Sequence, residues 1–218
     1  RTWRQEGNPA SFVIKRRIPY EDPRTVQDWK RELQAEGQAI VGLPIAEVDA
    51  VVAEAAAEGV VSVANHNAET QIVITGTPDA VARAGAMAAA RGAKAIALKV
   101  SGAWHSELIR GAEAEFKEAL AKVVFRAPER EIVLNVTAEP GADPVEIREV
   151  MTRQLCSPVR WYDGMRRMAE SGVEAFVEVG LGKVLSGLMR KILPKDSPAQ
   201  VYNVGSLAQI EAYLKAIA

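Results

Sequence analysis

Apolar and polar residues follow two different spacings between positions 38 and 100. Short apolar runs bounded by glycine, proline and polar residues alternate with segments in which apolar residues recur every three or four positions. The short runs predict four strands, at 38–43, 60–64, 71–75 and 95–100. The helical spacing predicts two helices, which begin at Pro44 and Pro78 and end near Gly59 and Gly92. The resulting order, βαββαβ, is that of a ferredoxin-like unit, which would also suit a regulatory ligand-binding or RNA-binding module.

Helix and strand patterns alternate again after residue 105. Three runs of apolar residues predict strands, at 132–137, 175–179 and 200–204. Helices are predicted at 107–124, 183–193 and 207–217, and a further one begins where Asp143 and Pro144 supply an N-cap and a first helical position. This alternation is typical of an α/β fold that completes a mostly parallel sheet.

Composition excludes several classes of function. The chain has 218 residues, 48% of them hydrophobic, and a formal net charge of −1, which leaves no excess of basic residues to bind nucleic acid. The single cysteine, Cys156, excludes an internal disulfide framework and suits a reducing compartment. Apolar runs are too short to span a bilayer and no signal sequence is evident, so we expect a cytoplasmic protein without a membrane partner. The histidines and cysteine are too few to build a metal site.

One histidine lies where catalytic residues often lie in α/β proteins. The predicted strand that ends at Val100 is followed by the small residues Ser101 to Ala103, then by Trp104 and His105. A polar residue just beyond a strand lies at the carboxyl edge of the sheet, where open α/β sheets place their sites. His105 is therefore a candidate general base, although a histidine there could also simply cap the next helix.

Four segments, in the same order along the chain, resemble the malonyl-CoA:acyl carrier protein transacylase family. In chain order, the segments are Asn65–Gly76, Val100–Leu108, Arg153–Trp161 with its Gln-Leu-x-x-Pro-Val-x-Trp pattern, and the glycine loop in Val177–Leu188. The resemblance covers residues 37 to 218. It implies an α/β-hydrolase-like acyltransferase core, formed by residues 1–37 and 101–218 and incomplete at the N-terminus. A ferredoxin-like βαββαβ subdomain at 38–100 would be inserted into that core.

The resemblance also implies roles for individual residues. His105 would be the general base, and the backbone carbonyl of Gln154 would hold its second ring nitrogen, where other hydrolases use an aspartate. Without the resemblance, Gln154 would be an ordinary amide at a helix end. Asn65 would lie near the acyl pocket, or else simply form a turn, and we expect His66 to be an exposed turn residue.

Substrate recognition needs a cation and a pocket wall. Malonyl carries a free carboxylate, which a guanidinium can bind through both oxygens, and the resemblance implies an arginine on the helix before the small subdomain. Arg31 matches that position when the sequence is aligned from Glu32, whereas Lys30 matches it when aligned from Tyr20; both could equally belong to a solvated face. The resemblance also associates an aromatic residue at Trp104 with malonyl rather than methylmalonyl.

The nucleophile of the family is not found in this sequence. Its serine lies in a Gly-His-Ser-x-Gly turn, and no Gly-x-Ser-x-Gly occurs in the 218 residues. Because the chain begins with Arg1 rather than methionine, we expect the part carrying the serine to be absent or replaced; a naturally inactive homologue is the alternative. Ser101 and Ser106 are poor substitutes, since neither lies in such a turn beside free N–H groups. Cys156 is also a poor substitute, because an isolated buried cysteine is usually an inert packing residue.

The sequence thus implies malonyl transfer from coenzyme A to acyl carrier protein, with the coenzyme A thioester as substrate and no resident cofactor. A noncatalytic scaffold or carrier-protein-binding protein and a thioester hydrolase on the same fold are the alternatives. Acyl carrier protein is acidic, so basic residues near the site would steer it. The candidates are Arg160, Arg166, Arg167, Arg190 and Lys191.

Overall fold

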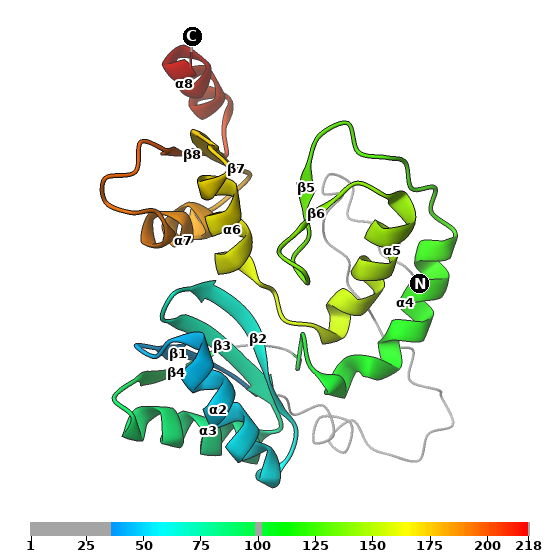
Figure 1. The fold of residues 1–218 in the computed structure, drawn as a ribbon, viewed down its shortest axis with the longest axis vertical. Coiled ribbons are helices and arrows are strands. Elements are labelled where there is room, and N and C mark those ends of the chain that lie inside the picture. Colours follow the sequence, from blue (N-terminus) through cyan, green and yellow to red (C-terminus); the bar gives the residue numbers. More distant parts are fainter. Residues whose placement is uncertain (1–35, 99–101, 218) are drawn as a thin grey trace. The chain divides into compact units, whose positions relative to one another are not determined.

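The structure is a computed structural model, and it describes residues 36–98 and 102–217 (Figure 1). The first described range contains β1 (Glu36–Val41), α2 (Ile45–Ala55), the 3-10 turn η1 (Ala56–Glu58), β2 (Val61–Ala68), β3 (Gln71–Gly76), α3 (Pro78–Ala90) and β4 (Lys94–Leu98). The predicted βαββαβ order is therefore confirmed. Pro44 is the N-cap of α2, and Gly59 and Gly92 adopt positive φ angles of 145° and 91° just beyond the helices, as expected for residues that end them.

The four strands form one sheet in the order β2-β3-β1-β4, and all its neighbouring strands are antiparallel. Ala39 of β1 lies opposite Val73 on one side and Ile96 on the other. Helices α2 and α3 pack against this sheet through the fully buried Val48 and Val81. The core of this region also contains Ile40, Leu43, Val51, Ala55, Val61, Ile72, Ile74, Ala80, Ala84, Ala88 and Ala93.

The predicted turn at Asn65–Asn67 is wrong. Strand β2 continues through these residues to Ala68, and its pairing with β3 shifts register between Val63 and Asn65 and again between His66 and Ala68. Such bulges let polar residues continue a strand. The outer side of this strand is also paired, because the His66 amide donates to the Val159 carbonyl at 2.9 Å and the Val159 amide donates to Ala64 at 2.8 Å.

The second described range consists of shorter elements. They are η2 (Glu107–Ala112), α4 (Glu113–Ala121), β5 (Ile132–Val133), β6 (Pro140–Gly141), α5 (Pro144–Arg153), η3 (Gln154–Cys156), α6 (Trp161–Glu170), β7 (Ala175–Val179), α7 (Val184–Ile192), β8 (Gln200–Val204) and α8 (Leu207–Ile217). The predictions for β7, β8 and α8 are confirmed, and β7 and β8 are parallel. Asp143 caps α5 as predicted, since its carboxylate accepts the Val145 amide at 2.8 Å. No helix of the two described ranges has the length and apolar content needed to span a membrane.

Two element predictions in this range are wrong. The single helix at 107–124 is a 3-10 segment followed by α4, and the break falls beside Gly111, a residue that disfavours helix interiors by about 1 kcal/mol. The strand at 132–137 is only two residues long. After it the chain turns back, with the Leu134 amide donating to Glu139 and Ala138 at a positive φ of 57°. The turn leaves Leu134 buried against Ile147.

Candidate active site

The backbone at His105 adopts an uncommon conformation. Its φ is 65°, in the left-handed region, which costs a residue other than glycine on the order of 1–3 kcal/mol. Its amide donates to the Leu155 carbonyl at 3.0 Å, a contact that helps to hold this conformation. His105 is not the cap of the following helix, because the Ser106 hydroxyl accepts the Leu108 amide at 3.3 Å and Ser106 is the N-cap of η2.

Two backbone carbonyls fix the tautomer of the His105 ring. Its Nδ1 lies 3.0 Å from the Gln154 carbonyl oxygen and 3.0 Å from the Ser157 carbonyl oxygen. Carbonyl oxygens only accept hydrogen bonds, so Nδ1 carries a hydrogen and donates it. In the neutral ring Nε2 then has the free electron pair, which is the state that a general base requires.

His105 lines a cleft of about 270 Å³. Every strand of the four-stranded sheet contributes to this cleft, whose lining is Gly37, Ala64, Asn65, Val73, Thr75, Leu98, Gly102, Trp104 and His105. The structure therefore brings together three of the predicted site residues: Asn65, Trp104 and His105. Gln154 joins them through its contact with the histidine ring, whereas Arg31 and Lys30 lie outside the described residues.

The indole of Trp104 forms one wall of the cleft beside Gly102. A Cβ placed on Gly102 would lie 3.5 Å from the indole ring, an ordinary van der Waals distance, so the ring packs directly over this part of the backbone. Trp104 is 43% exposed, which leaves part of its surface free for a ligand. Thr75, also in the lining, is buried, and its hydroxyl donates to the Glu36 carbonyl at 3.1 Å.

The prediction that His66 is exposed is wrong. Only 6% of His66 is exposed, because the bulged strand β2 presses it against α6, where the Tyr162 ring lies 4.8 Å away. Burial lowers the pKa of His66, and the opposing charge of Asp163, 3.7 Å from Nδ1, only partly offsets this effect. His66 is absent from the lining of the cleft.

Neither substitute nucleophile in the described residues has a suitable environment. The Ser106 hydroxyl is buried and donates to the Ala103 carbonyl at 2.7 Å. Burial raises the pKa of the Cys156 thiol, which disfavours the reactive thiolate. Ser101 lies outside the described residues. In the described part of the chain, no cluster of three or more His, Cys, Asp or Glu side chains could hold a metal ion.

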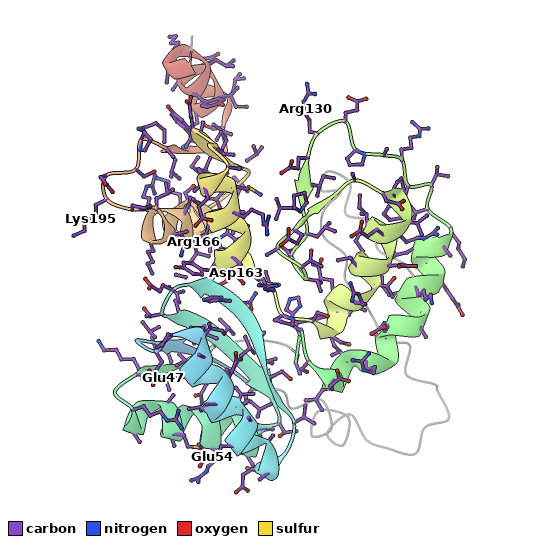
Figure 2. The ribbon with its side chains drawn as sticks, viewed as in Figure 1. Glu47, Glu54, Arg130, Asp163, Arg166 and Lys195 are labelled. Atoms are coloured by element: carbon purple, nitrogen blue, oxygen red, sulfur yellow. The ribbon has the colours of Figure 1, made fainter. Side chains whose placement is uncertain are left out.

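Three of the predicted basic steering residues line a second cavity, of about 560 Å³, beside α6. Arg160 pairs with Asp163 at 2.9 Å, Arg166 with Glu170, and Arg167 with Glu139; Asp163 and Arg166 lie on α6 (Figure 2). The positive and negative charges that line this cavity therefore balance. On α7, Lys191 donates to the Gln71 side chain at 2.9 Å and Arg190 is exposed. Steering of an acidic partner by these residues stays a prediction.

Sequence reasoning missed the Ser157 carbonyl as a second partner of the histidine ring. The signal that could have found it is Pro158, because a residue before proline is restricted to extended conformations. It also missed the pairing of the segment around Val159 with β2, for which the sequence gives no periodic signal.

Comparisons with known proteins agree on one family. A family model described as acyl transferase domain matches residues 29–210. The polyketide biosynthesis protein ThaF of Burkholderia thailandensis is 41% identical over 162 residues, which are 74% of this chain and 14% of ThaF. The malonyl CoA-acyl carrier protein transacylase of Escherichia coli (strain K12) is 42% identical over 156 residues, which are 71% of this chain.

A solved structure gives the same result. The acyl-carrier-protein S-malonyltransferase of Bartonella henselae is similar with a TM-score of 0.78 and 34% identity, over 84% of this chain and 58% of that protein. The chain spans about half the length of the curated transacylases that it matches, for example 50% of the Escherichia coli protein.

Proposed function

This chain belongs to the acyl transferase domain family, and from that premise we propose that it serves malonyl transfer from coenzyme A to the phosphopantetheine thiol of acyl carrier protein. The observation that carries the proposal is the ring of His105, whose Nδ1 is held by two carbonyls at 3.0 Å in the wall of a cleft. The names of the similar transacylases support the choice of malonyl-CoA and acyl carrier protein. We keep the cytoplasmic location and the absence of a resident cofactor as parts of the proposal.

The reaction uses the neutral ring in both directions. Nε2 of His105 takes the proton of a serine hydroxyl while the oxygen attacks the thioester carbonyl. As the carbon–sulfur bond breaks, the imidazolium returns that proton to the coenzyme A sulfur and an acyl-serine remains. The carrier protein thiol then loses its proton to Nε2 and attacks the ester, and the serine oxygen regains a proton from the ring. The Gln154 carbonyl accepts a hydrogen bond from Nδ1–H in every step and so stabilises the imidazolium.

The serine of this scheme comes from outside these 218 residues, since no Gly-x-Ser-x-Gly occurs among them. The environments of Ser106 and Cys156 support this, because the hydroxyl is already donated to Ala103 and the thiol pKa is raised. What these residues contribute to the proposed reaction is the base, the carbonyls that orient it and the cleft beside it.

Substrate recognition is assigned to three residues. Trp104 and Asn65 line the cleft, where the indole would crowd an α-methyl branch and the amide would bond the acyl group. A single methyl group discriminates by about 1–3 kcal/mol, so Trp104 favours malonyl without excluding larger groups. Arg31 is assigned to the malonyl carboxylate because a guanidinium can bind both of its oxygens.

The proposed architecture is an α/β-hydrolase-like core of residues 1–37 and 101–218 with a ferredoxin-like subdomain of residues 38–100 inserted into it. The strand order β2-β3-β1-β4 with antiparallel neighbours supports the subdomain. The parallel pair β7–β8 and its helices support the assignment of the second range to a hydrolase-like core.

The proposal is tested with the full-length protein, labelled malonyl-CoA and acyl carrier protein. We expect a mass gain on the protein and label on the carrier, and His105→Ala should slow transfer by about 10²–10⁴-fold, the usual contribution of a general base. The matched control is His66→Gln, which changes the other histidine and should keep transfer within a few fold.

The alternatives predict different results. A protein that never gains the acyl group but still binds the carrier is a scaffold. Release of free malonate without carrier protein identifies a thioester hydrolase. Equal transfer by the His105→Ala variant would contradict the role of the base.

A further inference from the structure

We infer that Pro158 is a positioning residue for His105, acting through the carbonyl of Ser157. The inference rests on the proposed function only in so far as His105 is the base. The tautomer and orientation of the His105 ring depend on two backbone carbonyls, and Pro158 sets the direction of one of them.

The two carbonyls that bind His105 belong to residues three positions apart on one segment. Carbonyls within a helix all point the same way along its axis, so Gln154 and Ser157 could not converge on one nitrogen if the helix continued. The structure avoids this by ending η3 at Cys156 and placing Ser157 in an extended conformation, with φ −117° and ψ 148°. The change of direction at Ser157 brings both oxygens to 3.0 Å from Nδ1.

Pro158 enforces that change of direction. The ring of a proline clashes with the backbone of the preceding residue in the helical region and leaves it the extended region. Pro158 itself is exposed, so the ring adds little to the core and its contribution is this restriction on Ser157. The direction of the Ser157 carbonyl is therefore determined by the next residue along the chain, Pro158.

A second contact fixes the other end of this segment. Val159, directly after the proline, pairs with β2, donating to Ala64 at 2.8 Å and accepting from the His66 amide at 2.9 Å. Ala64 and Asn65 of that strand line the cleft. The Ser157 carbonyl is thus held between the turn η3 and the strand that carries the acyl pocket residues.

The chain offers a direct measurement of this arrangement because it has only two histidines. In the ¹⁵N-histidine-labelled protein above pH 8, the nitrogen chemical shifts of His105 should report hydrogen on Nδ1 and none on Nε2. In Pro158→Ala the Ser157 backbone loses the restriction to extended conformations and keeps only the pairing of Val159 with β2, so we expect its carbonyl to bind Nδ1 less firmly and His105 to change from one tautomer to a mixture of two. An unchanged single tautomer in this variant, or hydrogen on Nε2 in the unaltered protein, would overturn the inference.

Two control variants distinguish the restraint that Pro158 places on the Ser157 backbone from other effects of a substitution. Pro198→Ala alters a second exposed proline that follows a half-buried serine, in the loop after α7, and should leave the His105 signals unchanged. Ser157→Ala keeps the carbonyl and removes only the hydroxyl, so it should also keep the single tautomer. The His66 signals show whether each variant folds, and Ser157→Gly, which loosens the same residue, replaces Pro158→Ala if that variant does not fold.

Activity provides an independent readout. In the full-length protein, Pro158→Ala should lower kcat of transfer about tenfold, part of the 10²–10⁴-fold contribution of a general base, with little change in KM. If transfer is never detected, the proposed function fails while the tautomer measurement still decides the inference. If transfer occurs and Pro158→Ala keeps the tautomer, the inference fails and the proposed function stands.

Discussion

Residues 36–98 and residues 102–217 differ in what stabilises them. The first range has one continuous core, in which both helices and the sheet bury large side chains such as Ile40, Val48 and Ile72 completely. The second range has smaller clusters, one around Leu134 and Ile147 and one around Met189 that also includes Ala68 of β2. Several of its large apolar residues are exposed, including Val179 and Leu181.

Side chains bind the first backbone amides of two helices in the second range, α5 and α7, whereas α4 and α6 start without such a bond. In residues 36–98, α2 begins at Pro44 and α3 at Thr77 without a hydrogen bond from a capping side chain. In residues 102–217, Asp143 accepts the Val145 amide, and Glu178 accepts the Ser186 amide at 2.8 Å and the Ser186 hydroxyl at 2.6 Å. These bonds from the Ser186 hydroxyl and backbone hold the pKa of Glu178 below its usual value.

The difference shows how the candidate site is divided. The four-stranded sheet supplies most of the lining of the cleft, and a range built from short elements and specific hydrogen bonds supplies the base and its carbonyl partners. The segment from Gln154 to Val159 connects the two, because it bonds the histidine at one end and β2 at the other.

The largest effect expected from this comparison is on core packing. Leu43→Ala should lower the free energy of unfolding by about 2–5 kcal/mol, because Leu43 belongs to the continuous core and only 5% of it is exposed. The matched change Leu181→Ala, at a leucine 96% exposed, should alter stability by less than about 0.5 kcal/mol. Urea unfolding of both variants tests the comparison, and equal losses would contradict it.

A smaller effect is expected at the start of α5. Asp143→Ala should lower the free energy of unfolding by about 1 kcal/mol, because the Val145 amide loses the carboxylate that accepts it. Asp143→Asn keeps an acceptor oxygen and should recover most of the loss. Urea unfolding of the two variants decides this, and an alanine variant as stable as the original would show that the cap is dispensable.

The sequence predicts regular elements well and irregular ones poorly. Periodic apolar residues and the Pro and Gly signals locate the βαββαβ elements and β7, β8 and α8. In these regular elements the residues that face the core recur at the period of a helix or a strand, so the apolar pattern in the sequence identifies them. The error at Asn65–Asn67 falls where a bulged strand pairs with residues distant in sequence. The errors at 107–124 and 132–137 fall where a 3-10 segment and a tight turn with a positive φ replace the regular hydrogen bonds of a helix or strand. Likewise, the Gln154 carbonyl is expected only through family resemblance. Pro158 indicates that Ser157 is extended, but the structure is needed to show that the Ser157 carbonyl contacts His105.

The smallest expected effect concerns His66, where β2 of the first range meets α6 of the second. The charged groups that face it are Asp163, Arg160 and Asp49, and burial is the dominant influence, lowering its pKa from 6.5. When the pH falls below about 6.5, the unfolded chain binds a proton at His66 before the folded chain does, so the free energy of unfolding should decrease. Well above that pH the residue is neutral in both states and adds no slope.

Urea unfolding between pH 5 and pH 8 measures this slope. His66→Gln cannot take up the proton, so the part of the decrease that belongs to His66 should disappear. His105→Gln, at the other and less buried histidine, should keep it. If the unaltered protein and His66→Gln lose stability equally on acidification, His66 is not what makes the contact between β2 and α6 sensitive to pH. The two ranges are then joined at this point by the backbone pairing of Val159 and by apolar packing alone.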